Sequence, residues 1–278
     1  MKTTIGKGKW KITVLYCGEH TVPKSAHTVG LDSNLILRFP YLAFLLQNGE
    51  SNVLVDNGIN ERFLIDGKAW GGAPADAGSK DLVASLQKAG LTVDDIDLIL
   101  YTHLHNDHAG NCNLFPQTRS IAQQDEWFNL LNQVFVETQR RDYDNEVIPF
   151  LKANKNFHTI DGDLEIMEGL RVVKTPGHTR GSQTVVVNTV NGLRLLVGDQ
   201  FHQACSCFPE MISIMDVTGK EYPITPAPEG WPTIPSSLIY DYYDYYASTD
   251  RIRALMPERD PMYVLCGHDA SLLYRKDV

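Results

Sequence analysis

Short apolar runs recur along the 278-residue chain, and a turn signal closes each of them. The runs are KITVLYC, LAFLLQNG, NVLVDNG, DLILYTH, LRVVKTPGH, QTVVVNT, RLLVGD and MYVLCGHD. Their length and their content of Val, Ile and Leu predict β-strands, several of which are buried on both faces.

Helical patterns lie between some of these runs. In SKDLVASLQKAG, Leu82, Val83 and Leu86 share one face, Ser79 is the expected N-cap, and Gly90 is the expected C-terminal stop. QQDEWFNLLNQVF and SSLIYDYYDYYASTDRIRAL have similar patterns. Because strands are followed by helices in both halves, the sequence predicts a layered α/β fold, in one domain over residues 1–278.

The segment from about 201 to 235 lacks such periodicity and is rich in proline. We expect a long loop there. Long loops in compact domains often act as lids or binding loops, and the alternative is a tolerated excursion on the surface.

Composition narrows the classes of partner. The net charge is -9 and no stripe of Lys or Arg is present, which argues against a nucleic-acid partner. No run approaches the ~18 apolar residues that span a bilayer, so no membrane association is expected. The N-terminus has no continuous apolar segment of the kind found in signal peptides, and the five cysteines are sparse, so we expect a reducing, cytoplasmic location.

Candidate metal ligands follow four of the predicted strands. The sequence THLHNDHAGN at 102–111 is the densest group, and single ligands follow the strands at TPGH, LLVGD and LCGH. The residues are His103, His105, Asp107, His108, His178, Asp199 and His268. Sites in α/β layers form just beyond strand ends, so these side chains are expected to meet.

Imidazole and carboxylate ligands without thiolate indicate a divalent metal, with zinc expected and iron, manganese, cobalt or nickel as alternatives. These ligands are too many for one tetrahedral ion and suffice for two ions that share a carboxylate. A lone histidine is more often a satisfied core group. Histidines crowded as in HLHNDH are harder to explain that way, because charged rings repel one another and a metal would replace the missing counter-ions.

These motifs, HxHxDH at 103–108 with the Gly-His, Asp and Gly-His that follow, resemble the metallo-β-lactamase superfamily, and the likeness extends from LVDNG at 54–58 to GHD at 267–269. The resemblance implies an αββα sandwich of two similar halves with the metal site at the sheet edge. It also implies that Asp199 bridges the two ions and that Asp56 supports the site from behind. The remaining ligands divide by position into His103, His105 and His178 for the first ion and Asp107, His108 and His268 for the second.

Two such ions lower the pKa of a water held between them, so that hydroxide is supplied near neutral pH and attacks an ester-like carbonyl. Asp107 is expected to pass a proton to the leaving group, with a role as ligand alone as the alternative. The overall layout is most similar to N-acyl homoserine lactonases, which implies a lactone substrate opened by hydrolysis.

One position departs from that subfamily. The lactonases usually place a tyrosine three residues after the bridging aspartate, where this chain has His202 in DQFHQ. An imidazole can donate a hydrogen bond to a developing oxyanion or act in acid/base catalysis. Asp-x-x-His is similar to methyl-parathion-hydrolase-like relatives, so hydrolysis of other esters or phosphotriesters is the alternative function. The alternative for His202 is a histidine that supports the site from behind the ligands or packs within the loop.

Aromatic residues near the site are candidates for substrate binding. Tyr242 and Tyr246 share a helical face within YDYYDYY, and Phe201 and Phe208 lie in the proline-rich segment. They either line a wall for an acyl or aromatic group or pack within the protein. We assign no role to His20, His27 and His158. A non-catalytic metal-binding scaffold and a homodimer remain as further alternatives.

Overall fold

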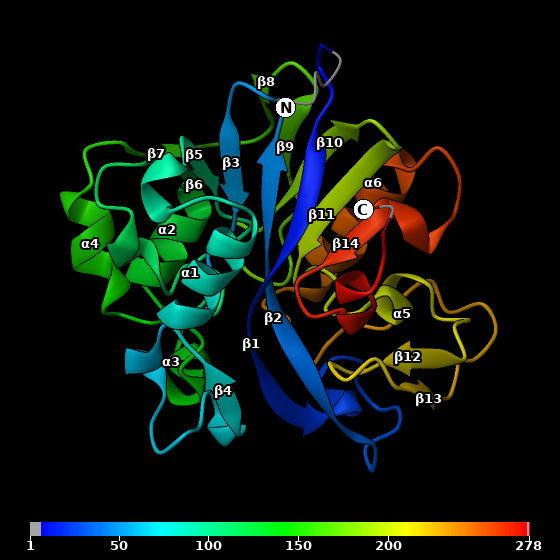
Figure 1. The fold of residues 1–278 in the computed structure, drawn as a ribbon. Coiled ribbons are helices and arrows are strands. Elements are labelled where there is room, and N and C mark those ends of the chain that lie inside the picture. The colour runs from blue at the N-terminus through cyan, green and yellow to red at the C-terminus, as the bar shows by residue number, and fades with distance from the viewer. Residues whose placement is uncertain (1–6, 277) are drawn as a thin grey trace.

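The computed structural model describes residues 7–276 and 278. Two main sheets form the centre of the molecule (Figure 1). The larger sheet has the strand order β4-β1-β2-β3-β5-β6-β7, and the smaller has the order β14-β11-β10-β9-β8. The larger sheet comprises β1 Lys11–Pro23, β2 Ile36–Gln47, β3 Asn52–Val55, β4 Ala75–Ala77, β5 Leu98–Leu100, β6 Arg119–Gln123 and β7 Phe157–Ile160. The smaller comprises β8 Leu164–Met167, β9 Leu170–Lys174, β10 Gln183–Thr189, β11 Gly192–Gly198 and β14 Val264–Cys266.

Alternation of side chains along the strands explains why the sheets stack. In β10, Val185 and Val187 face the core between the two sheets, while Val186 faces the opposite side. Phe44 and Val55 of the larger sheet pack into the same central core. Because successive side chains point to opposite faces, each sheet buries both of its surfaces.

Helices cover the two outer faces (Figure 1). The residues of α1 Ser79–Lys88, α2 Gln124–Leu131 and α4 Val147–Ala153 pack on the larger sheet, whereas α6 Tyr242–Leu255 packs on the smaller one. A shorter helix, α3 Phe135–Arg140, follows α2. The layers therefore run helix, sheet, sheet, helix, which confirms the expected αββα sandwich.

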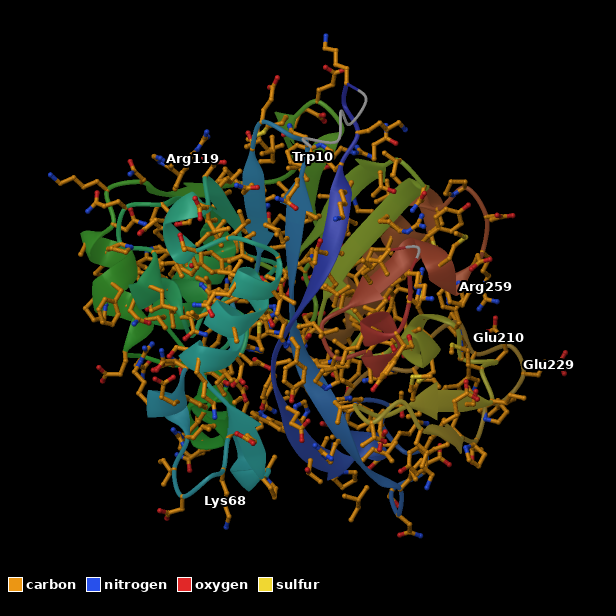
Figure 2. The ribbon with its side chains drawn as sticks, viewed as in Figure 1. Trp10, Lys68, Arg119, Glu210, Glu229 and Arg259 are labelled. Carbon is orange, nitrogen blue, oxygen red and sulfur yellow. The ribbon has the colours of Figure 1, made fainter. Side chains whose placement is uncertain are left out.

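The N-terminal half supplies the larger sheet and the C-terminal half the smaller one. Trp10 joins them, since its backbone N–H donates to the carbonyl of Asn188 and its indole to the carbonyl of Glu168. Figure 2 places Trp10 where the two sheets meet and Lys68, Arg119 and Glu229 at the periphery. None of the helices in the described part of the chain is long and apolar enough to cross a membrane.

Two local expectations are wrong. Gly78, not Ser79, caps α1, because the backbone N–H and hydroxyl of Ser79 both donate to Glu61. The segment from 201 to 235 is not a loop throughout: it contains α5 Ala204–Cys207 and a hairpin of β12 Ser213–Met215 and β13 Glu221–Pro223. Phe201 and Phe208 anchor this segment in the core beneath α6, so its first part is fixed to the fold.

Candidate metal centre

The potential ligands follow four strands that end at one edge of the sandwich. His103, the first of the HLHNDH ligands, follows β5, while His178, Asp199 and His268 follow β9, β11 and β14. Gly198 lets β11 approach this edge closely, because a Cβ there would lie 2.5 Å from the Thr102 hydroxyl. Both sheets therefore contribute to one buried cluster.

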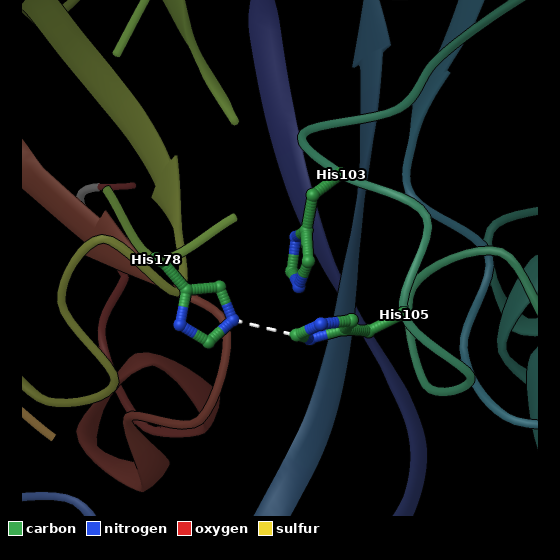
Figure 3. Close-up of side chains that lie close together, drawn as sticks. All are labelled: His103, His105 and His178. Carbon is green, nitrogen blue, oxygen red and sulfur yellow. Dashed lines mark hydrogen bonds between the residues drawn. The ribbon is translucent and has the colours of Figure 1, made fainter. Parts of the chain in front are cut away.

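Three histidines form the first ligand group (Figure 3). Nε2 of His178 lies 3.1 Å from Nδ1 of His105, and the His103 ring centroid lies 4.6 Å and 4.8 Å from those of His105 and His178. All three rings are buried. Nε2 of His103 has no hydrogen-bond partner among the described residues, although it is buried. A cation is the partner that such converging nitrogen atoms lack.

The second group consists of Asp107, His108, Asp199 and His268. Asp199 lies between the groups. Its Oδ1 is 3.2 Å from Nε2 of His108, and its Oδ2 is 3.1 Å from Nε2 of His268 and 3.7 Å from Nε2 of His178. Asp107 is the least buried ligand, with 15% of its side chain exposed, and its Oδ2 is 3.5 Å from Nε2 of His268.

The outer nitrogen atoms of these histidines are held in place. Nδ1 of His178 lies 2.7 Å from the carbonyl oxygen of Leu238, and Nδ1 of His268 lies 3.0 Å from that of Pro40. Nδ1 of His108 lies 2.8 Å from Oδ2 of Asp56. A hydrogen bond on one ring nitrogen orients the other for coordination, so the donor set fits divalent cations such as zinc.

Charges differ between the two groups. Burial lowers the pKa of His103 well below its ordinary value, and burial lowers that of His178 to about 4, so these rings are neutral and able to ligate. Burial alone would lower the pKa of His108, but Asp199, Asp107 and Asp56 raise it well above the ordinary value. The carboxylates of the second group thus attract positive charge, which a cation would supply in place of a proton.

Asp56 supports the site as the family resemblance implies. Its Oδ1 accepts from the backbone N–H of Thr102, and its Oδ2 accepts from the Thr102 hydroxyl, both at 2.7 Å. Its backbone has a φ of 58°, in the left-handed region that aspartate tolerates better than most residues. Asp56 thereby fixes both His108 and the start of the HLHNDH loop.

Glu126, at the start of α2, is a supporting residue that sequence reasoning missed. Its carboxylate accepts from the backbone N–H of Leu104 at 2.8 Å, from the hydroxyl of Thr179 at 2.5 Å and from the backbone N–H of Gly181 at 3.1 Å. These contacts tie the loop after β5 to the loop after β9. In the sequence it is one acidic residue in a helical pattern, and no local signal distinguishes it.

Among the residues proposed to contact substrate, only His202 lies in the cluster. Its Nε2 is 3.2 Å from Oδ2 of Asp199, and it groups with His178 and Asp199 as a further potential ligand. Phe201 and Phe208 are fully buried in the core beneath α6, whereas Tyr242 and Tyr246 are exposed by 48% and 42%. None of these four lies among the residues that line the cavity next to the cluster.

That cavity is lined partly by residues to which sequence analysis assigned no role. His20 and Tyr41 line it from β1 and β2, and His27, Trp70 and Leu238 line it from connecting segments. A second cavity, which His105 also lines, is lined by Arg140 and by apolar residues such as Val134 and Ile239. Residues of the cluster therefore line both a histidine-rich cavity and a second cavity.

Comparison with known proteins identifies the superfamily of this fold. A family model of the metallo-beta-lactamase superfamily matches residues 37–268. The chain belongs to this superfamily, which confirms the resemblance drawn from its motifs.

Its relatives include N-acyl homoserine lactonases. The N-acyl homoserine lactonase AiiA of Bacillus thuringiensis subsp. kurstaki is 31% identical over 179 residues, which cover 62% of this chain and 66%, just under two thirds, of AiiA. AiiB of Agrobacterium fabrum (strain C58 / ATCC 33970), also named an N-acyl homoserine lactonase, is 25% identical over 262 residues, covering 88% of this chain and 86% of AiiB.

Solved structures share the fold over nearly the whole chain. An N-acyl homoserine lactone hydrolase, solved with the product N-hexanoyl-L-homoserine at its catalytic metal centre, has a TM-score of 0.73 with this structure at 23% identity. The match covers 98% of this chain and 96% of that one. At this level of identity the comparison establishes the fold.

Proposed function

We propose that the chain is a hydrolase that depends on two divalent metal ions and opens the lactone ring of N-acyl homoserine lactones. The observation that carries this proposal is the meeting of two ligand groups at Asp199, beside a cavity wide enough to admit solvent-sized groups. The names of the related lactonases support the choice of substrate.

The residues that would hold the ions are the seven predicted ligands. His103, His105 and His178 would hold the first ion, Asp107, His108 and His268 the second, and Asp199 both. Zinc is the ion we expect, because nitrogen and carboxylate oxygen ligands at buried sites suit it. Two divalent ions at such a site supply Lewis acidity, which lowers the pKa of water and polarises an ester carbonyl.

The chain's own residues would then orient the substrate and move protons. Asp107 is the most exposed of the carboxylates in the cluster and lines the cavity, and it would pass a proton to the departing alkoxide oxygen. His202 lines the same cavity, and its Nδ1 has no hydrogen-bond partner among the described residues. It would contact the carbonyl oxygen on which negative charge develops.

The test compares substrate classes on zinc-loaded protein with a pH-indicator assay. We expect acid release from N-hexanoyl homoserine lactone at a higher kcat/KM than from an aryl ester or a phosphotriester. Hydrolysis of the other esters with no lactone turnover would overturn the proposal.

His202 gives specific support to the second candidate, a hydrolase of other esters or phosphotriesters. His202→Tyr places a phenol at this position. An increase in lactonase activity with a loss of esterase activity in this variant would favour the second candidate, whereas loss of lactonase activity would favour the first.

A further inference from the structure

Two buried histidines outside the proposed ligand groups line the cavity beside the metal cluster. His20 lies on β1, and its ring stacks on Tyr41 with centroids 4.7 Å apart. His27 follows the short 3-10 helix Lys24–Ala26, and its ring centroid is 4.9 Å from that of His202. The Nε2 atoms of His20 and His27 are 3.3 Å apart, so one of them donates to the other.

The side chain of Gln203 decides the direction of that hydrogen bond. Its Nε2 lies 2.6 Å from the carbonyl oxygen of His268, which can only accept, so this atom is the amide nitrogen. The same Nε2 lies 3.2 Å from Nδ1 of His27. Because an amide nitrogen only donates, Nδ1 of His27 is an acceptor and the ring carries its single proton on Nε2.

The proton on Nε2 of His27 is then donated to Nε2 of His20. His20 must accept there, so its own proton lies on Nδ1. That Nδ1 is buried and has no hydrogen-bond partner among residues 7–276 and 278. Burial lowers the pKa of both rings well below the ordinary value, in agreement with two neutral rings. The series from Gln203 to His20 therefore ends in a buried, unpaired N–H donor on a residue that lines the cavity.

We infer that His20 is a substrate-contacting residue whose Nδ1–H donates to an oxygen acceptor next to the scissile ester, and that His27 and Gln203 are positioning residues that fix its tautomer. A buried donor without a partner disfavours an apolar group and selects a substrate that brings an acceptor. In an N-acyl homoserine lactone the amide carbonyl oxygen is such an acceptor. This identification of the acceptor rests on the proposed function, whereas the assignment of a tautomer to each histidine ring does not.

The tautomers are tested without turnover. Two-bond and three-bond nitrogen–proton NMR correlations on zinc-loaded, ¹⁵N-histidine-labelled protein distinguish the two ring forms, and His20→Phe and His27→Phe assign the signals. We expect His20 with its proton on Nδ1 and His27 with its proton on Nε2. The opposite tautomer at either ring, or a charged ring, overturns the inference whatever the enzyme hydrolyses.

Contact with the substrate is tested by comparing the hydrolysis of two lactones by the wild type and by His20→Phe. One is N-hexanoyl homoserine lactone, and the other is a γ-butyrolactone with an alkyl chain of similar length at the same ring carbon and no amide. His20→Phe keeps an aromatic ring and removes the Nδ1 donor together with the Nε2 acceptor. We expect it to lower kcat/KM about tenfold for the amide-bearing lactone, mainly through KM, and to leave the amide-free lactone within about twofold.

Two further variants separate contact from structural damage. His20→Asn keeps an N–H donor at the position of Nδ1 and should recover part of the loss. His158→Phe removes an exposed histidine on β7 and should match the wild type on both lactones. Equal losses on both lactones in His20→Phe would overturn the contact. If the wild type hydrolyses neither lactone, the proposed function fails, and the NMR result still decides which ring nitrogen of His20 and of His27 carries the proton.

Discussion

Asp56 is not itself a candidate ligand, but it orients His108 of the second ligand group. It accepts from Thr102 and holds Nδ1 of His108 at 2.8 Å. A carboxylate there keeps His108 oriented and raises the basicity of its inward nitrogen.

Asp56→Asn should weaken metal binding at the second group by about 10-fold to 100-fold, because the amide is a poorer acceptor than a carboxylate. Competition with a chromophoric chelator measures the affinity. Asp94→Asn changes an exposed aspartate in the same way and is the control. Unchanged affinity in the Asp56 variant would show that His108 does not need this partner.

His20 and His27 predict a dependence of stability on pH. Burial lowers the pKa of both rings well below 6.5 in the folded protein, and the nearby His268 and His202 lower it further. As the pH falls through 6.5, the unfolded chain takes up protons on these rings and the folded chain does not. The free energy of unfolding should fall by up to ~1.4 kcal/mol per pH unit for each ring.

The metal-free protein should therefore lose less stability between about pH 7 and about pH 5.5 when His20 is replaced by Phe. Urea unfolding of wild type and His20→Phe at both pH values gives the difference, which we expect to be ~1 kcal/mol. Parallel losses in the two proteins would mean that folding does not lower the pKa of His20.

The candidate ligands and the supporting residue Asp56 were predictable at this scale, whereas the other supporting residues were not. The HLHNDH motif places its candidate ligands at neighbouring positions, so it can be recognised from the sequence without knowledge of the fold. His20, His27 and Glu126 acquire their roles from partners far away in the sequence, such as Gln203 and Thr179. The aromatic residues Phe201 and Phe208 misled for the same reason, because side chains near a site in sequence can point into the core.

At the scale of elements, α2 links the two loops that carry the first ligand group. Glu126 accepts from both loops, and the Gly181 backbone approaches so closely that a Cβ there would lie 2.1 Å from the Glu126 nitrogen. The tyrosine hydroxyl of Tyr143 donates to the same carboxylate at 3.1 Å. Each acceptor position of Glu126 is thus used.

Glu126→Gln should lower the free energy of unfolding by about 1–3 kcal/mol, since the amide nitrogen faces donors that it cannot satisfy. It should also lower the metal content of the purified protein, because the first ligand group loses its alignment. Chemical denaturation and elemental analysis on the same sample give both values. Glu165→Gln, an exposed change on β8, is the control, and two indistinguishable variants would refute the role of α2.

The strands that sequence reasoning found are those with continuous apolar runs. Each of the eight runs contains a strand of the structure, because buried strands need apolar side chains on both faces. β6 and β7 were missed: they are short, and parallel pairing with β5 and with each other stabilises them. The hairpin of β12 and β13 was also missed; its two strands pair only with each other and belong to neither main sheet.

At the scale of the whole molecule, the candidate metal cluster joins the two sheets. The candidate ligands of HLHNDH follow a strand of the larger sheet, while His178, Asp199 and His268 follow strands of the smaller one. The fold class was predictable because the order and spacing of these ligands are specific to the superfamily. The cavities beside these residues depend on how whole segments pack, so no local sequence pattern predicted the cavities.

Removing metal should therefore destabilise the whole sandwich. At a metal concentration about a thousand times Kd, binding adds ~4 kcal/mol to the free energy of unfolding. Calorimetry with and without a chelator should show a marked drop in Tm for the wild type. Asp199→Ala should bind less metal and respond much less, and an equal response in that variant would argue against a bridging role for Asp199.

The measurement that tests the central claim most directly is a zinc titration of metal-free protein, with acid release from N-hexanoyl homoserine lactone followed at each step. Seven candidate ligands with one shared carboxylate predict activity that rises with added zinc and saturates near two ions per chain. Protein that binds two ions and releases no acid, or that hydrolyses the lactone equally well without metal, would contradict the account.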